Sequence, residues 1–198
     1  MYKSLSFDEL EQRLPFVTPE SWAERVASWQ KIVPPPPFLI VLDYTGIFGN
    51  KTELRPKEEL ESLLSFLESF AVVGIYSSTM YKNIIPGLKK YNLAQRFMFI
   101  FDRTHTRLDP DYLIDQKVEE YDTVKHLDLI TNNPVINTKR QYGIDNTIIC
   151  DDSPRKIRYI HDDNALVLPT WTGSNNIEEI KSLILHKVEK LKAKWRLT

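Results

Sequence analysis

The chain has 198 residues, of which 42% are hydrophobic and 27% charged, and its formal net charge is −1 at pH 7. A chain of this length can bury the core of one ordinary domain, and a charge near zero creates no overall field that would draw it to nucleic acid or to an anionic membrane. No apolar run reaches the roughly 20 residues that span a bilayer, and the single cysteine, Cys150, excludes an internal disulfide.

Residues 1–37 predict a helical arm followed by a spacer. Thr18 can cap a helix that begins at Pro19. Apolar residues then recur every three to four positions, at Trp22, Val26, Trp29 and Val33. The four prolines at 34–37 favour an extended spacer. We interpret the apolar stripe as packing on the main domain, and the alternative is a helix that binds a partner.

Residues 38–198 predict a single domain in which strands and helices alternate. Strands are predicted at 38–43 ("FLIVLD"), 71–76 ("AVVGIY"), 97–101 ("FMFIF"), 146–152 ("NTIICDD") and 165–169 ("ALVLP"). Helices are predicted at 56–70, 119–130 and 175–195, together with a helix at 82–91 that is broken by Pro86 and Gly87. The last helix has an apolar stripe through Ile177, Ile180, Ile184, Val188, Leu191 and Trp195. This alternation is typical of an α/β fold with a doubly wound, mostly parallel sheet.

Polar side chains stand where three of the predicted strands end. Asp43 closes the first strand, Ser77 follows the second, and Asp151 and Asp152 close the fourth. Ligands of open α/β sheets bind beyond the carboxyl ends of the strands. A lone aspartate after a strand is a common turn residue, but three polar strand ends in one sheet indicate a site.

The chain carries, in order, residues that resemble the four motifs of the haloacid-dehalogenase (HAD) superfamily: Asp43, Ser77, Lys125, and Asp151 with Asp152. The resemblance is closer to the branch with C-terminal-domain phosphatase, or NLI-interacting-factor, homology. Residues 55–78 resemble its arginine–proline start, helix, strand and serine motif. Residues 146–156 ("NTIICDDSPRK") and 163–173 ("DNALVLPTWTG") are similar to its final segments. The resemblance runs from about residue 38 to the C-terminus and implies a HAD-like, Rossmannoid fold.

The resemblance also implies a role for each matching residue. Asp43 would attack phosphorus, and Lys125 would neutralise both Asp43 and the transferred group. Ser77 would donate a hydrogen bond to a phosphoryl oxygen. Asp43, Asp151 and Asp152 would hold Mg²⁺ through hard oxygen ligands. The enzyme that this implies is a Mg²⁺-dependent phosphatase acting on proteins.

The sequence departs from the family where the proton-transfer step is made. Family members have a second aspartate two residues after the nucleophile, which serves as general acid and then general base. Thr45 stands there, and Ile47 replaces the usual threonine two residues later. The hydroxyl of a threonine is neither an acid nor a base near pH 7. We therefore predict a remnant site that keeps its nucleophile and metal ligands but has lost efficient phosphomonoester hydrolysis.

Two interpretations accommodate this substitution. Some HAD enzymes without the second acid are dehalogenases or phosphonate hydrolases, but their clefts are closed by a cap domain, and no cap is inserted between Asp43 and Ser77. The other interpretation is a noncatalytic member. Residues 34–48 ("PPPPFLIVLDYTGIF") resemble the start of the presequence-receptor subunit of the mitochondrial inner-membrane translocase, whose phosphatase-homology fold binds polypeptides. We therefore expect a protein-binding subunit of a larger mitochondrial assembly, either an import complex or a ribosome, and a nuclear or cytoplasmic location if the protein is an active phosphatase.

Several further segments are candidates for contacts. The C-terminal helix carries Lys187, Lys190, Lys192, Lys194 and Arg196. Cations in a last helical turn complement the helix dipole, and RNA contact is the alternative. Cys150 should point away from Asp151 along the strand and is predicted to be buried rather than nucleophilic. His126, beside Lys125, is predicted to lie on the surface. The polar segments 102–122 and 131–145 are predicted to contact partners.

Overall fold

The computed structural model describes residues 38–50, 52–109, 122–134, 136–137 and 141–195. The predicted arm and proline spacer at 1–37 lie outside the described residues. The strands are β1 (Phe38–Leu42), β2 (Ala71–Tyr76), β3 (Ile100–Phe101), β4 (Arg107–Leu108), β5 (Thr123–Val124), β6 (Thr147–Asp151) and β7 (Ala165–Val167). The α-helices are α3 (Lys57–Glu68), α4 (Tyr81–Lys90), α5 (Asp128–Thr131) and α6 (Ile177–Trp195), and short 3₁₀ turns are η1 (Ala94–Arg96), η2 (Arg103–His105) and η4 (Pro154–Ile157).

A five-stranded parallel sheet with the order β3-β2-β1-β6-β7 forms the centre of the domain. This confirms the predicted α/β class and parallel sheet. β1 is the central strand, and its side chains are buried on both faces of the sheet. Ile40 and Leu42 pack in one core, and Leu39 and Val41 pack in the other. A strand that is covered on both faces is apolar at every position rather than at alternate ones.

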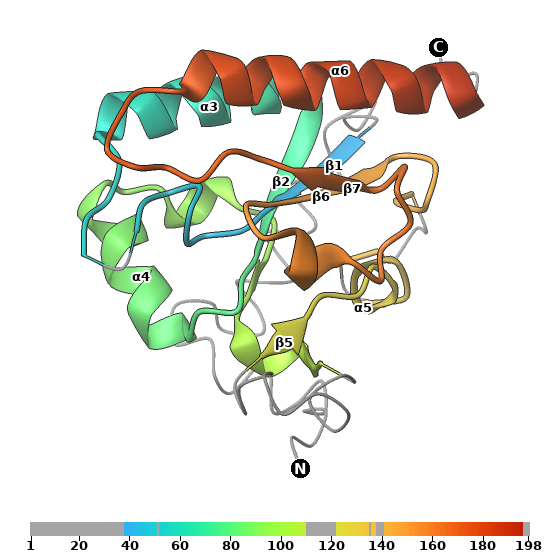
Figure 1. Cartoon of the computed structure of the whole chain (residues 1–198), viewed down its shortest axis with the longest axis horizontal. Helices are drawn as coiled ribbons and strands as arrows, with labels where there is room; N and C mark the ends of the chain where they lie inside the picture. Colours follow the sequence, from blue (N-terminus) through green and yellow to red (C-terminus); the bar gives the residue numbers. More distant parts are fainter. Residues whose placement is uncertain (1–37, 51, 110–121, 135, 138–140, 196–198) are drawn as a thin grey trace.

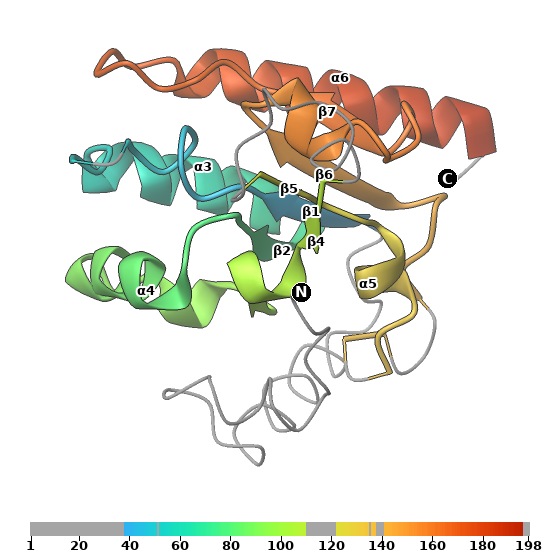
Figure 2. The ribbon, with the colours of Figure 1, turned by 60° about the horizontal axis from the view of Figure 1, so that its bottom comes forward.

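The helices cover the two faces of the sheet. α3, α4 and α6 contribute their apolar residues to the core that contains Ile40, and α3 and α6 run side by side over the sheet (Figure 1). Ile130 of α5 and Ile157 of η4 belong to the opposite core, and α5 and α6 lie on opposite sides of the sheet (Figure 2). Within the described residues, no helix has the length and apolar character that a bilayer crossing requires.

Two helix predictions were wrong. The segment predicted as a helix at 119–130 contains β5, which pairs antiparallel with β4, and only the short helix α5 follows; residues 119–121 lie outside the described part. The pairing of β5 with a distant strand outweighs its helical pattern. The helix predicted to break at Pro86 runs unbroken as α4, because Ile84, Ile85 and Leu88 are buried on its inner face and packing outweighs the backbone hydrogen bond that proline removes.

Two smaller differences concern element ends. The third strand is shorter than predicted: only Ile100 and Phe101 form β3, although Phe97, Met98 and Phe99 are buried. The apolar stripe of α6 is buried from Ile177 to Leu191, whereas Trp195 is 41% exposed. The predicted stripe is therefore one residue too long.

Gly87 in α4 lets the helix approach the loop that follows β1. A Cβ atom at this position would lie 2.0 Å from the hydroxyl oxygen of Tyr44, whose ring stacks on Phe48. In an open helix interior, replacing glycine with alanine stabilises by about 1 kcal/mol. Here we expect Gly87→Ala to lower the free energy of unfolding by about 1–3 kcal/mol, because the buried hydroxyl must be displaced.

A double-mutant cycle in urea tests this contact. In a Tyr44→Phe background the hydroxyl is gone, so Gly87→Ala should cost less by about 1 kcal/mol or more. An equal cost in both backgrounds would show that the hydroxyl contact is not the reason for the glycine.

Candidate functional site

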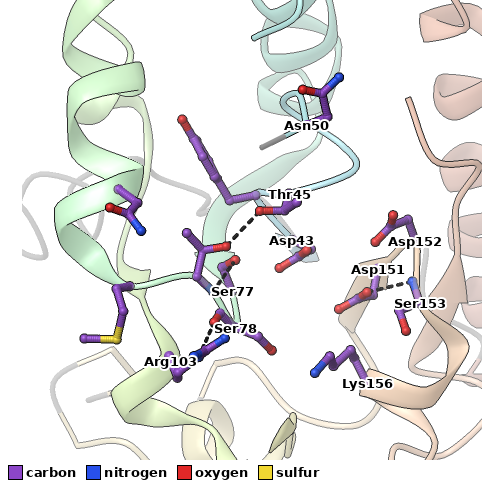
Figure 3. A pocket seen from close by; sticks show the side chains of 14 residues that line it. Asp43, Thr45, Asn50, Ser77, Ser78, Arg103, Asp151, Asp152, Ser153 and Lys156 are labelled. Atoms are coloured by element: carbon purple, nitrogen blue, oxygen red, sulfur yellow. Dashed lines mark hydrogen bonds between the residues drawn. The ribbon is translucent and has the colours of Figure 1, made fainter. Parts of the chain in front are cut away.

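Asp43, Ser77, Asp151 and Asp152 meet at the carboxyl end of the sheet, where β1, β2 and β6 end. A cleft of about 740 Å³ opens there, lined by Asp43, Ser77 and Asp151 together with Thr45 and Asp152. Figure 3 shows Asp43 facing Asp151 and Asp152 across the cleft, with Ser77 and Ser78 on the β2 side. Parallel strands bring these residues together because they all end at the same edge of the sheet.

Lys125 is fully buried behind the cleft and joins two of its carboxylates. Its Nζ donates to Asp43 Oδ1 at 2.9 Å and to Asp151 Oδ2. Burial alone disfavours a charged lysine, but the negative charges of Asp43 and Asp151 outweigh it and raise the pKa of Lys125. The backbone N–H of Lys125 donates to the carbonyl of Lys156, which fixes the lysine next to the segment after β6.

The three aspartates carry more negative charge than Lys125 neutralises. Burial raises the pKa of Asp43, against the attraction of Lys125 and with added repulsion from Asp151. Burial also raises the pKa of Asp152, where repulsion from Asp43 adds to it. A carboxylate cluster with this excess of charge favours a cation that would compensate it.

The donor set fits Mg²⁺. One oxygen from each of Asp43, Asp151 and Asp152 lies within 4.8 Å of the others, and Mg²⁺ prefers such hard carboxylate oxygens. Two hydrogen bonds orient the ligands from outside: the Ser153 N–H donates to Asp151 Oδ1 and the Thr170 hydroxyl donates to Asp152 Oδ2, both at 2.8 Å. Partners of this kind fix the direction in which a metal ligand points.

Thr45 lines the cleft at the position where the resemblance implies an acid. Its Oγ1 lies 2.8 Å from Thr79 Oγ1, so the two hydroxyls share a hydrogen bond, which is the dashed line that starts at Thr45 in Figure 3. Ser77 is buried, and its Oγ accepts the Thr79 N–H at 3.2 Å. Among the described residues that line the cleft, the carboxylates are Asp43, Asp151 and Asp152, and there is no histidine. Apart from the three clustered aspartates, the titratable side chains of this lining are Tyr44, Arg103 and Lys156, so no further carboxyl or imidazole stands in for the acid that Thr45 replaces.

Sequence reasoning missed three residues around the cleft. Arg103 and Lys156 line it, and Thr170 holds Asp152. Arg103 lies in the polar segment 102–122, which the sequence predicts to contact partners. Its Nε donates to the Ser78 carbonyl at 2.7 Å. Lys156 comes four residues after Asp152, and its Nζ lies 3.6 Å from Asp122 Oδ1. Lys156 and Thr170 lie within the segments 146–156 and 163–173 that carry the family resemblance, which was the available signal. Neither spacing nor periodicity distinguishes them from their neighbours.

Other candidate residues lie away from the chemistry. Cys150 is buried on the β6 strand, and burial raises the pKa of its thiol. His126 follows β5 instead of lying on a helix, and its ring stacks on that of Tyr159. In the basic C-terminal helix, Lys187 donates to the Asp162 carbonyl and Lys194 pairs with Asp163, so both contact the turn before β7. Residue 196 lies outside the described residues.

Comparison with protein families agrees with the fold. A search of curated proteins finds no match. A family model described as NLI interacting factor-like phosphatase matches residues 27–195. This range contains every residue named at the cleft and all the strands of the parallel sheet. The chain therefore belongs to the family of NLI interacting factor-like phosphatases.

Proposed function

We propose that this protein has lost efficient phosphomonoester hydrolysis and acts by binding protein partners within a larger assembly. The observation behind the loss of hydrolysis is Thr45: its hydroxyl pairs with Thr79, and apart from the three clustered aspartates the described lining of the cleft holds no carboxyl and no imidazole. Hydrolysis needs a proton for the leaving oxygen and a base for the attacking water. Loss of such a group typically slows a reaction by about 10²–10⁴-fold.

The retained residues support phosphoryl binding. Asp43 stands at the cleft with one oxygen bonded to Lys125, which balances part of the charge that an incoming phosphoryl group brings. A bound Mg²⁺ would supply the remaining charge neutralisation, held by Asp43, Asp151 and Asp152. Arg103 and Lys156 add positive charge at the wall of the cleft. These residues make the cleft suited to anionic ligands although proton transfer is missing.

The second candidate is a Mg²⁺-dependent protein phosphatase. The arrangement of Asp43, Lys125 and Asp151 favours it, because nucleophile, cation and metal ligand are already within hydrogen-bonding contact. It requires that a group other than residue 45 supplies the acid and the base. For the first candidate, the resemblance of residues 34–48 to a mitochondrial presequence receptor supports a mitochondrial import complex as the assembly; a mitochondrial ribosome is the other setting, where the basic C-terminal helix would contact RNA.

An aryl phosphate with an acidic phenol separates the two candidates. Its leaving group departs as the phenolate and needs no proton, so Asp43 can form a bond to phosphorus while the phosphorus–aryloxy bond breaks. Water attack on the aspartyl-phosphate still lacks a base. With Mg²⁺ we therefore expect release of at most one phenolate per protein, a matching phosphoryl adduct by mass spectrometry, and a steady rate equal to that of Asp43→Asn. Sustained Mg²⁺-dependent turnover above this control would support the phosphatase instead.

A further inference from the structure

Arg55 is a fully buried arginine beneath the loop that follows Asp43. Each of its three nitrogens has a partner in a different segment: Nε donates to the Ile47 carbonyl, Nη1 to Glu59 at 3.1 Å and Nη2 to Asn176 Oδ1 at 2.6 Å. Ile47 belongs to the loop after β1, Glu59 to α3, and Asn176 precedes α6. A buried guanidinium with this many partners fixes the segments around it.

The same guanidinium also contacts the segment that carries Thr170. Its Cζ lies 5.5 Å from the centre of the Trp171 ring. The backbone N–H of Trp171 donates to the Gly46 carbonyl at 2.7 Å, so the Trp171 segment and the Asp43 loop are joined directly as well as through Arg55. Arg55 therefore sits where these two segments meet.

Both segments hold Asp152. Thr170 Oγ1 donates to Asp152 Oδ2 at 2.8 Å. Gly46, with a φ of +88°, lies so close to the Asp152 carboxylate that a Cβ atom would be 2.1 Å from Oδ2. Arg55 contacts Ile47 and Trp171, and these follow directly after Gly46 and Thr170 in the chain. Two of its contacts are therefore one residue away from the two residues that place Asp152.

We infer that Arg55 is a positioning residue for the cation site: it sets the place of the Asp152 carboxylate relative to Asp43 and Asp151 through the Gly46 and Thr170 segments. This rests on the proposed Mg²⁺ site in the same cleft. Arg55 is not among the described residues that line the cleft. Its effect on the cation passes through the direction in which Asp152 points.

Arg55→Lys in the full chain tests the inference. Lysine keeps the charge but has one nitrogen instead of a planar fork, so it cannot serve Ile47, Glu59 and Asn176 together. We expect Mg²⁺ affinity, measured by titration calorimetry, to fall by about tenfold or more, as it does when outer ligand partners are removed. Thr170→Val removes the direct hydrogen bond to Asp152 and should weaken affinity by a similar factor.

The double variant distinguishes positioning from general stability. If both residues act on Asp152, the loss in Arg55→Lys with Thr170→Val should be smaller than the product of the single losses. The matched control is Arg96→Lys, which breaks the pair of hydrogen bonds from Arg96 to Glu68 and should leave Mg²⁺ affinity unchanged.

Three outcomes would count against the inference. Wild-type Mg²⁺ affinity in a less stable Arg55→Lys protein would overturn it and leave Arg55 a purely structural residue. Should Arg55→Lys fail to fold, Asn176→Ala removes one partner at a partly exposed position, and unchanged affinity in both Asn176→Ala and Thr170→Val would overturn it equally. Absence of Mg²⁺ binding by the wild type would remove the cation site on which the inference rests, which is a separate failure because loss of hydrolysis does not depend on it.

Discussion

Thr45→Asp is expected to convert the protein into a Mg²⁺-dependent phosphomonoesterase, with a rate about 10²–10⁴-fold above that of the wild type. Residue 45 lines the cleft together with Asp43, so a carboxyl there is placed to protonate the leaving oxygen and then to activate water. The remaining parts, Asp43, Lys125 and the carboxylate cluster, are already assembled.

The gain should depend on the leaving group. Alkyl phosphates need a proton on the departing oxygen and should gain most, whereas acidic aryl phosphates should gain mainly in the hydrolysis of the aspartyl-phosphate. Thr45→Asn places a side chain of the same shape as aspartate, but its amide is neither an acid nor a base near pH 7, so this variant should stay inactive. Thr45→Asp combined with Asp43→Asn should also stay inactive, because the nucleophile is missing. An inactive Thr45→Asp that still binds Mg²⁺ would mean that more than the proton-transfer group has been lost.

Lys125→Met should lower the free energy of unfolding by about 3–5 kcal/mol, as expected when one partner of a buried ion pair is removed. The lysine side chain is fully buried, and it contacts Asp43 and Asp151, which are 10% and 1% exposed. Methionine fills the volume but leaves two carboxylates close together without their cation. Urea unfolding of the variant and the wild type measures the loss.

Two comparisons assign that loss to charge. Adding Asp43→Asn to Lys125→Met removes one unpaired carboxylate and should recover part of the stability. Mg²⁺ binds the folded state and therefore stabilises it. The stabilisation should be larger in Lys125→Met than in the wild type, because the variant lacks the cation that balances Asp43 and Asp151. Lys57→Met, which breaks an exposed pair with Glu61, is the control and should change stability by less than about 1 kcal/mol. A loss of similar size in the control would argue against a special role for Lys125.

The parallel sheet and the meeting of the site residues could be predicted because they depend on local patterns. Apolar runs such as "FLIVL" mark strands that are covered on both faces, and parallel strands end at one edge, so Asp43, Ser77 and Asp151 had to lie near one another. Helices α3 and α6 were predicted correctly for a similar reason, since their apolar spacing spans several turns.

What could not be predicted depends on partners far away in the sequence. β5 lies in a helical pattern and becomes a strand only through β4. The hydrogen bond from Arg55 to Asn176 spans 121 positions, and Thr79, which pairs with Thr45, carries no pattern of its own. In each case a single tertiary contact decides the outcome, and such a contact leaves no periodicity in the sequence.

The position of β1 has a consequence for synthesis of the protein. Ile40 pairs with Val73 on one side and with Ile148 on the other, so the central strand is made first and receives its second neighbour late. While the nascent chain is shorter than β6, one edge of β1 has unpaired N–H and C=O groups beside apolar side chains, which is a template for aggregation. Fragments that stop before Thr147 therefore keep this edge of β1 unpaired. β1 becomes paired on both sides only when the carboxyl-terminal part of the domain has left the ribosome.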